Sequence, residues 1–277
     1  FGGTSTVAAK ATRVRARIVA QTINEQMQAS DKVFIMGHAN EDYDAIGSAI
    51  GMAKLSLSLN KETYIVVSGR NENVNRISEM LASESMKVTG HEEDYNSIMV
   101  EEEEALKHIT PDSLLVLVDH HREILTASKA VLEAISKRII VDHHRRAEDL
   151  IGDTVLLYLE PSSSSTSELL TELVGYFNDR LEITPAEATA LYSGIVLDTK
   201  NFAVQTGERT FEAAALLRRS GADPNMVRLM FKDDMDVLKL RARLIAEAKT
   251  IEPGIAIALY KRAEKGAKAT ILAAQVA

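Results

Sequence analysis

Residues 138–144 read Arg138-Ile139-Ile140-Val141-Asp142-His143-His144, a β-rich apolar run that ends in one acid and two histidines. The same arrangement recurs along the chain. Further apolar runs at 33–37, 114–118 and 191–197 lead into the polar groups His38/Asp42/Asp44, Asp119/His121 and Asp198. One such coincidence is common in globular proteins, but four in one chain indicate a shared metal site.

The composition is that of an ordinary globular protein, with 277 residues of which 45% are hydrophobic and 26% charged. Cysteine is absent, which excludes disulfides, thiolate zinc sites and a cysteine nucleophile. The net charge of −8 gives little general attraction to duplex DNA or anionic membranes, so we expect neither as a partner. No apolar stretch approaches the roughly 20 residues that a bilayer span needs. The chain begins without methionine and ends within a pattern, so we expect a piece of a longer protein.

The order of the apolar runs predicts an α/β fold, a mainly parallel sheet flanked by helices. Between residues 33 and 160, β-rich runs alternate with helix-like stretches, as in successive βα units. The expected strands are 33–36, 63–67, 114–118, 138–141 and 154–159, and the expected helices are 4–29, 44–58, 72–83 and 124–136.

The remainder of the chain is predicted to be mostly helical up to residue 247, with a last long helix over 225–249. A strand is expected at 254–260, and residues 266–277 resemble the first turns of another βα unit. The predicted organisation is therefore a linker helix (1–30), a catalytic domain (31–235), and a connecting helix with the truncated start of a smaller α/β domain (236–277).

The carboxyl ends of parallel strands are where such sheets bind ligands. The candidate metal ligands are two imidazoles and four carboxylates: His38, Asp42, Asp44, Asp119, His143 and Asp198. This hard, oxygen-rich set without sulfur favours Mn²⁺ or Mg²⁺ over structural Zn²⁺. Six ligands suit two ions about 3.5–4 Å apart that share a carboxylate and a water. Such a water is a hydroxide near neutral pH, so the set predicts hydrolysis at phosphorus.

Several neighbouring residues leave alternatives open. His120 and His121 should point to opposite faces of an extended chain, so at most one is expected to point inward. His144 is a candidate phosphate contact, and Arg145 is either a phosphate contact or a surface residue. The Ser162–Ser167 loop either binds an anion or only caps a helix. Gly47 and Gly51 are interpreted as close packing of their helix on the sheet.

Four motifs together resemble the DHH phosphoesterase superfamily. They are Gly37-His38-Ala39-Asn40-Glu41-Asp42-Tyr43-Asp44-Ala45-Ile46-Gly47-Ser48, Val118-Asp119-His120-His121, Val141-Asp142-His143-His144-Arg145 and Gly194-Ile195-Val196-Leu197-Asp198-Thr199. Three finer segments resemble the GdpP/YybT type of cyclic di-AMP phosphodiesterases within it. These are Glu160-Pro161 with the loop 162–168, Asp198-Thr199-Lys200-Asn201-Phe202, and Arg209-Thr210-Phe211-Glu212-Ala213-Ala214.

The resemblance implies a DHH domain followed by a truncated DHHA1 domain. It implies that the six candidates are the metal ligands, that Asp119 bridges two Mn²⁺ ions, and that His144 contacts the substrate phosphate. The expected catalytic residues are Asp119, His143 and His144, and the expected substrate contacts are His144, Arg145, Ser165, Thr166 and Asn201. Full proteins of this type carry transmembrane helices upstream, so the module is expected in the cytoplasm without membrane contact of its own.

The leading hypothesis is a two-metal phosphodiesterase that hydrolyses cyclic di-AMP to linear pApA through a metal-bridging hydroxide. One alternative is a nanoRNase or exonuclease that acts on short linear oligonucleotides. Another is a nucleotide sensor whose metals are structural. A homodimer is a possible assembly for each. The glycine-rich GGGH segment of the DHHA1 domain does not occur in this sequence.

Overall fold

A six-stranded, all-parallel sheet forms the centre of the computed structural model, which describes residues 3–82, 86–88, 91–178, 181–232, 235–253 and 255–258. The strand order is β5-β2-β1-β6-β7-β8. The strands are β1 (Lys32–Met36), β2 (Glu62–Val66), β5 (Met99–Val100), β6 (Leu114–Val118), β7 (Lys137–Asp142) and β8 (Thr154–Leu159). This confirms the predicted α/β architecture.

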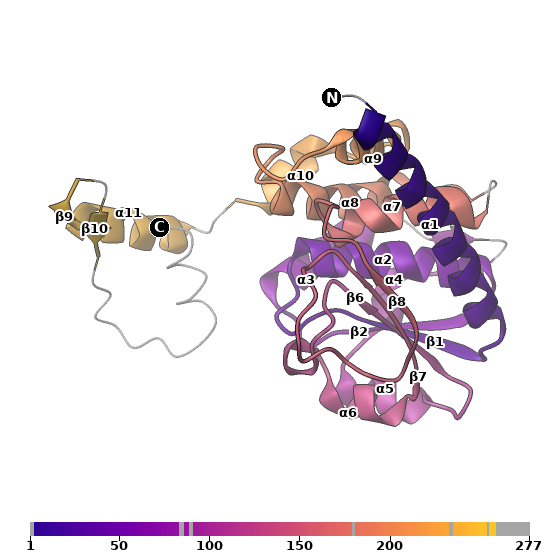
Figure 1. The fold of residues 1–277 in the computed structure, drawn as a ribbon. Helices are drawn as coiled ribbons and strands as arrows, with labels where there is room; N and C mark the ends of the chain where they lie inside the picture. The colour runs from indigo at the N-terminus through magenta and orange to yellow at the C-terminus, as the bar shows by residue number, and fades with distance from the viewer. Residues whose placement is uncertain are drawn as a thin grey trace. The chain divides into compact units, whose positions relative to one another are not determined.

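Helices cover both faces of the sheet, which explains why its central strands are apolar on both sides. All five residues of β6 are buried. On one face, Leu115 and Leu117 pack in a cluster with Ala105 of α5 (Glu102–His108) and Val131 of α6 (Lys129–Ala134). On the other face, α2 (Tyr43–Ser58) packs on β1 and β6, and α7 (Thr166–Phe177) packs on β7 (Figure 1).

The remaining elements surround this core or follow it. They are α1 (Gly3–Gln28), α3 (Glu72–Leu81), β3 (Met86–Val88), β4 (His91–Glu93), α4 (Tyr95–Ile98), η1 (Glu123–Leu125), α8 (Pro185–Asp198), α9 (Glu208–Arg219), α10 (Pro224–Met230), α11 (Met235–Glu247), β9 (Lys249–Glu252) and β10 (Ile255–Ile257). Helix α1 packs along α7, and its exposed Arg13 forms an ion pair with Glu212.

Three predicted elements differ from the structure. The helix predicted over 124–136 is a short 3-10 turn followed by α6, because Ser128 caps a new helix by accepting a hydrogen bond from the Val131 N–H (3.1 Å). The long helix predicted over 225–249 is divided into α10 and α11. Of the strand predicted at 254–260, residues 255–257 form β10, which pairs antiparallel with β9, and residues 254, 259 and 260 lie outside the described part. The βα unit predicted at 266–277 lies outside the described residues.

The contacts divide the chain into two compact units, Phe1–Val227 and Arg228–Ala277. The first contains the sheet and its covering helices. Within the second, the described part contains the end of α10, α11 and the β9–β10 hairpin. The domain limits predicted at 30/31 and 235/236 stay predictions. Among the described residues, no helix combines the length and the apolar character that crossing a bilayer requires.

Candidate metal centre

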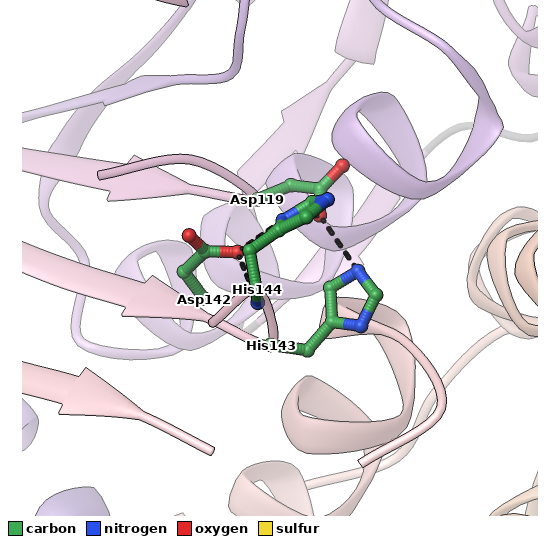
Figure 2. A group of neighbouring side chains, drawn as sticks. All are labelled: Asp119, Asp142, His143 and His144. Carbon is green, nitrogen blue, oxygen red and sulfur yellow. Dashed lines mark hydrogen bonds and ion pairs between the residues drawn. The ribbon is translucent and has the colours of Figure 1, made fainter. Parts of the chain in front are cut away.

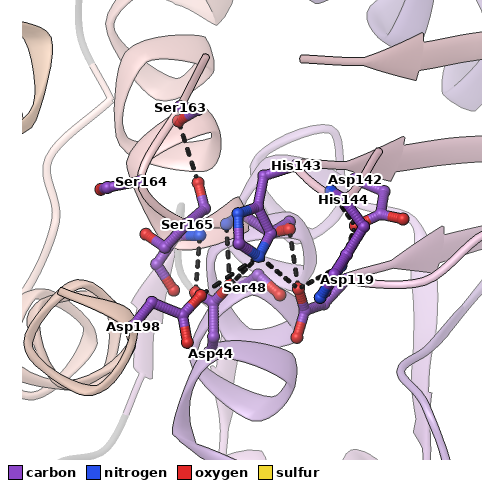
Figure 3. Close-up of polar contacts among 12 residues, drawn as sticks. Asp44, Ser48, Asp119, Asp142, His143, His144, Ser163, Ser164, Ser165 and Asp198 are labelled. Atoms are coloured by element: carbon purple, nitrogen blue, oxygen red, sulfur yellow. Dashed lines mark hydrogen bonds and ion pairs between the residues drawn. The ribbon is translucent and has the colours of Figure 1, made fainter. Parts of the chain in front are cut away.

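All six predicted ligands converge at the carboxyl edge of the sheet. His38, Asp119 and His143 follow the ends of the neighbouring strands β1, β6 and β7. Asp44 lies in the first turn of α2, and Asp198 is the last residue of α8. Figure 3 shows Asp44, Asp119, His143 and Asp198 pointing toward one another from these separate elements.

The ligands form two groups that meet at Asp119. In the first, His38 Nε2 lies 3.6 Å from Asp42 Oδ1 and 3.5 Å from Asp119 Oδ2. In the second, His143 Nε2 lies 3.1 Å from Asp198 Oδ2 and 4.0 Å from Asp44 Oδ2. Asp119 Oδ1 is 3.5 Å from the same His143 nitrogen. The two oxygens of Asp119 therefore face two different histidines.

The donor set fits divalent cations on its own chemistry. Within each of the groups His38/Asp42/Asp119 and Asp44/His143/Asp198, one ligand atom per residue lies within 4.8 Å of the others. His143 Nε2 is buried and makes no hydrogen bond to any described residue. Asp198 Oδ2 lies 3.1 Å away, but the direction from the ring nitrogen to this oxygen is unsuitable for a hydrogen bond. Such a nitrogen among carboxylates is suited to an ion.

The buried carboxylates of the centre also favour the binding of positive charge. Burial, together with the negative charges of Asp119 and Asp198, raises the pKa of Asp44 well above its usual value. Burial lowers the pKa of His38, but hydrogen bonds to Asp119 and Asp42 outweigh it and raise this pKa to about 11. In the metal-free protein, protons thus neutralise carboxylates that two dications would neutralise instead.

The N-terminus of α7 holds two of the carboxylates in place. The backbone N–H groups of Thr166 and Ser167 donate to the two oxygens of Asp44 at 2.7 and 2.8 Å. The Thr166 hydroxyl donates to Asp119 Oδ1 at 3.0 Å. Ser165 caps the same helix by accepting from the Glu168 N–H. Helix N-termini favour anions in this way, and the loop at 162–167 therefore supports ligands that the sequence did not connect with it.

The buried carboxylate of Asp142 orients His121 and His144 through hydrogen bonds. It is fully buried and accepts hydrogen bonds from His121 Nδ1 (2.5 Å) and His144 Nδ1 (2.8 Å), and Figure 2 shows its contact with His144. Burial alone would raise the pKa of Asp142, but these hydrogen bonds hold it far below its usual value. His121 Nε2 accepts from the Ala147 N–H, so Nδ1 carries the proton that His121 donates to Asp142.

The predicted substrate contacts divide into two kinds. Ser165 and Thr166 are buried and engaged as described. His144, Arg145 and Asn201 are exposed and lie within three residues of a predicted ligand in the sequence. In the metal-free protein, the hydrogen bond to Asp142 raises the pKa of His144 to about 9, which favours the protonated ring. All five roles in substrate binding stay predictions.

Two further expectations are corrected by the geometry. His120 and His121 are both buried, since helices cover both faces of the sheet, and the left-handed backbone of Asp119 (φ 62°) interrupts the extended chain just before them. Gly47 and Gly51 pack closely against α8 rather than against the sheet. A Cβ added at Gly47 would lie 2.4 Å from the Ala190 carbonyl oxygen. This close approach of α2 and α8 brings Asp44 to Asp198.

Known proteins are similar to this chain over most of its length. The chain is 39% identical over its whole length to the cyclic-di-AMP phosphodiesterase PdeA of Listeria monocytogenes. It is 42% identical over 93% of its length to the cyclic-di-AMP phosphodiesterase GdpP of Geobacillus thermodenitrificans. The chain spans only 41% and 38% of these relatives.

A solved structure of an exopolyphosphatase-related protein from Bacteroides fragilis shares the fold. It has a TM-score of 0.67 at 21% identity, over 83% of this chain and 65% of that one. The model of the DHH family, N-terminal domain, matches residues 32–195, which include five of the six ligands. With this match and this site, the chain belongs to the DHH family.

Proposed function

We propose that this chain hydrolyses cyclic di-AMP to linear pApA at a centre of two divalent ions, with Mn²⁺ as the preferred metal. The substrate is proposed from the two relatives whose names carry this activity, of which the chain spans about two fifths. The metal is proposed from the ligand set, since carboxylates with imidazoles and no thiolate suit Mn²⁺.

The observation that carries the proposal is the position of Asp119. Its Oδ2 faces His38 and its Oδ1 faces His143, at 3.5 Å each, as a carboxylate shared by two ions requires. Two bound dications would lower the pKa of a coordinated water and neutralise charge on the phosphate.

The chain's own residues would then have separate tasks. Asp142 accepts the Nδ1 proton of His144 and raises the pKa of this ring, which favours the imidazolium form that carries a second proton at Nε2. A phosphate oxygen there would gain a charge-assisted hydrogen bond. The α7 N-terminus fixes Asp44 and Asp119 before substrate arrives, which reduces the reorganisation needed during reaction.

The test is an assay of the Mn²⁺-loaded chain with cyclic di-AMP, in which pApA is separated by chromatography. Asp119→Asn and His143→Ala should each lose at least about 100-fold in kcat/KM, because each removes a metal ligand. His108→Ala, which changes a histidine on α5, is the control. Turnover retained by Asp119→Asn would contradict the metal centre. Faster cleavage of pApA or short oligoribonucleotides than of cyclic di-AMP would favour the linear-substrate alternative.

A further inference from the structure

A buried glutamate lies in the sequence between the predicted ligands His38 and Asp42, and the proposed mechanism does not use it. Glu41 immediately precedes the ligand Asp42 and is only 2% exposed. Carboxylates are rarely buried this completely unless their oxygens are satisfied by partners. Its partners therefore indicate what the side chain does.

The partners of Glu41 come from the segment that joins β2 to α3 and from the first turn of α3. The Ser68 N–H donates to Oε1 at 2.5 Å, and the Ser68 hydroxyl donates to Oε2 at 3.0 Å. Asn71 Nδ2 donates both to Oε2 (3.1 Å) and to the Glu41 carbonyl oxygen (3.0 Å). Asn73 Nδ2 donates to the same carbonyl at 3.1 Å. Both the side chain and the backbone of Glu41 are thus fastened to one segment.

The backbone around Glu41 needs such fastening. The preceding residue, Asn40, has a left-handed backbone (φ 57°), a conformation that costs free energy in most residues. The Asn40 N–H donates to the Ser68 hydroxyl at 3.2 Å. Asn71 is itself anchored, because it caps α3 by accepting from the Val74 N–H at 2.9 Å.

The ligand loop between His38 and Asp42 is therefore held at both ends. Near His38, the Ala39 N–H donates to the Leu125 carbonyl oxygen at 2.6 Å. Near Asp42, the contacts of Glu41 hold the loop. These contacts lie next to Asp42 of the group His38/Asp42/Asp119. The backbone of Asp44 is linked to the same point, because its N–H donates to Asp42 Oδ1 at 2.9 Å, but its carboxylate is held separately by the N-terminus of α7.

We propose that Glu41 is a positioning residue that sets the geometry of the His38/Asp42 half of the metal centre. It accepts the hydrogen bonds of Ser68 and Asn71 and thereby fixes Asp42 relative to His38. The inference rests on the proposed two-ion centre but does not depend on the identity of the substrate. Loss of an outer partner of this kind typically weakens metal binding by about 10- to 100-fold.

The experiment measures Mn²⁺ affinity by calorimetry in two backgrounds that each keep one half of the centre. Asp198→Asn retains the His38 half, and Asp42→Asn retains the His143 half while keeping a good helix cap. Glu41→Gln is isosteric but places an amide donor among the donors of Ser68 and Asn71. It should weaken Mn²⁺ binding at least about tenfold in the first background and less than about twofold in the second.

Two further variants separate position from charge and from stability. Asn71→Ser keeps an N-cap oxygen but removes both amide hydrogen bonds to Glu41 without changing charge, so it should weaken the same half. Glu187→Gln changes a buried carboxylate held by Lys54 and Tyr95, and it should leave both affinities unchanged.

The inference is overturned if Glu41→Gln weakens both halves equally or neither. It is also overturned if Asn71→Ser has no effect, because Glu41 would then act through its charge. A wild-type chain that binds one ion would contradict the two-ion centre instead. In that case, the role of Glu41 is decided by whether Glu41→Gln weakens the binding of that single ion.

Discussion

Gly194 is the position where the smallest change should damage the metal centre most. A Cβ added there would lie 2.2 Å from Ser167 Oγ, 2.5 Å from Asp44 Oδ1 and 2.9 Å from Asp44 Cα. The serine hydroxyl can rotate away, but the backbone of Asp44 cannot. Because ordinary contacts to Cβ begin at 3.4 Å, Gly194→Ala must push Asp44 away from α8 by on the order of 0.5–1 Å.

Two effects of Gly194→Ala on stability oppose each other. Forcing a methyl group between packed helices costs about 1–3 kcal/mol, whereas alanine is favoured over glycine in a helix by about 1 kcal/mol. The net loss in unfolding free energy should therefore be about 0–2 kcal/mol. Metal ligands tolerate displacements of only about 0.2 Å, so Mn²⁺ affinity of the Asp44/His143/Asp198 group should fall at least about tenfold.

The assay combines urea unfolding of the metal-free protein with Mn²⁺ calorimetry. Gly175→Ala in α7 is the matched control, because a Cβ there has nothing within 4 Å. It should raise stability by up to about 1 kcal/mol and leave metal binding unchanged. If Gly194→Ala binds two Mn²⁺ ions with wild-type affinity, the close approach of α2 and α8 does not set the position of Asp44.

Three other predictions concern protons and buried charge. The pKa of His38 is raised to about 11 in the metal-free protein, so Mn²⁺ binding should release protons at neutral pH and should become tighter as pH rises. Calorimetry in buffers of different ionisation enthalpy measures this release. A binding enthalpy that is the same in all buffers would contradict it. Asp142→Asn removes the main cause of the raised pKa of His144, so this pKa should fall from about 9 toward about 6.5 in an NMR titration. A pKa that stays near 9 would show that Asp142 does not raise it. Lys54→Met leaves Glu187 buried without its cation. It should lower the free energy of unfolding by about 3–5 kcal/mol and leave Mn²⁺ affinity unchanged. A loss of unfolding free energy below about 1 kcal/mol would show that the ion pair does not stabilise the fold.

The convergence of the ligands was predictable from the sequence for a simple reason. Parallel strands end at one edge of their sheet, so residues that follow β1, β6 and β7 must lie close together. Apolar runs of strand length marked those ends. Asp198 could be added because its helix ends in the same kind of apolar run.

The support of the ligands was not predictable, since it depends on contacts between distant segments. The N–H groups of Thr166 and Ser167 reach Asp44 across more than a hundred residues of sequence, and a serine-rich loop only indicates a cap. The burial of both His120 and His121 depends on other segments, such as those that bring Asp142 and Ala147 to His121. The hydrogen bonds of Glu41 depend in the same way on the distant Ser68 and Asn71.

The central claim is that Asp119 is shared by two metal ions. A crystal structure of the Mn²⁺-loaded chain, with anomalous diffraction data collected at the manganese edge, tests it most directly. We predict two anomalous peaks about 3.5–4 Å apart, with Oδ2 of Asp119 bound to the ion near His38 and Oδ1 bound to the ion near His143. A single peak, or two peaks of which only one is bound by Asp119, would contradict the account.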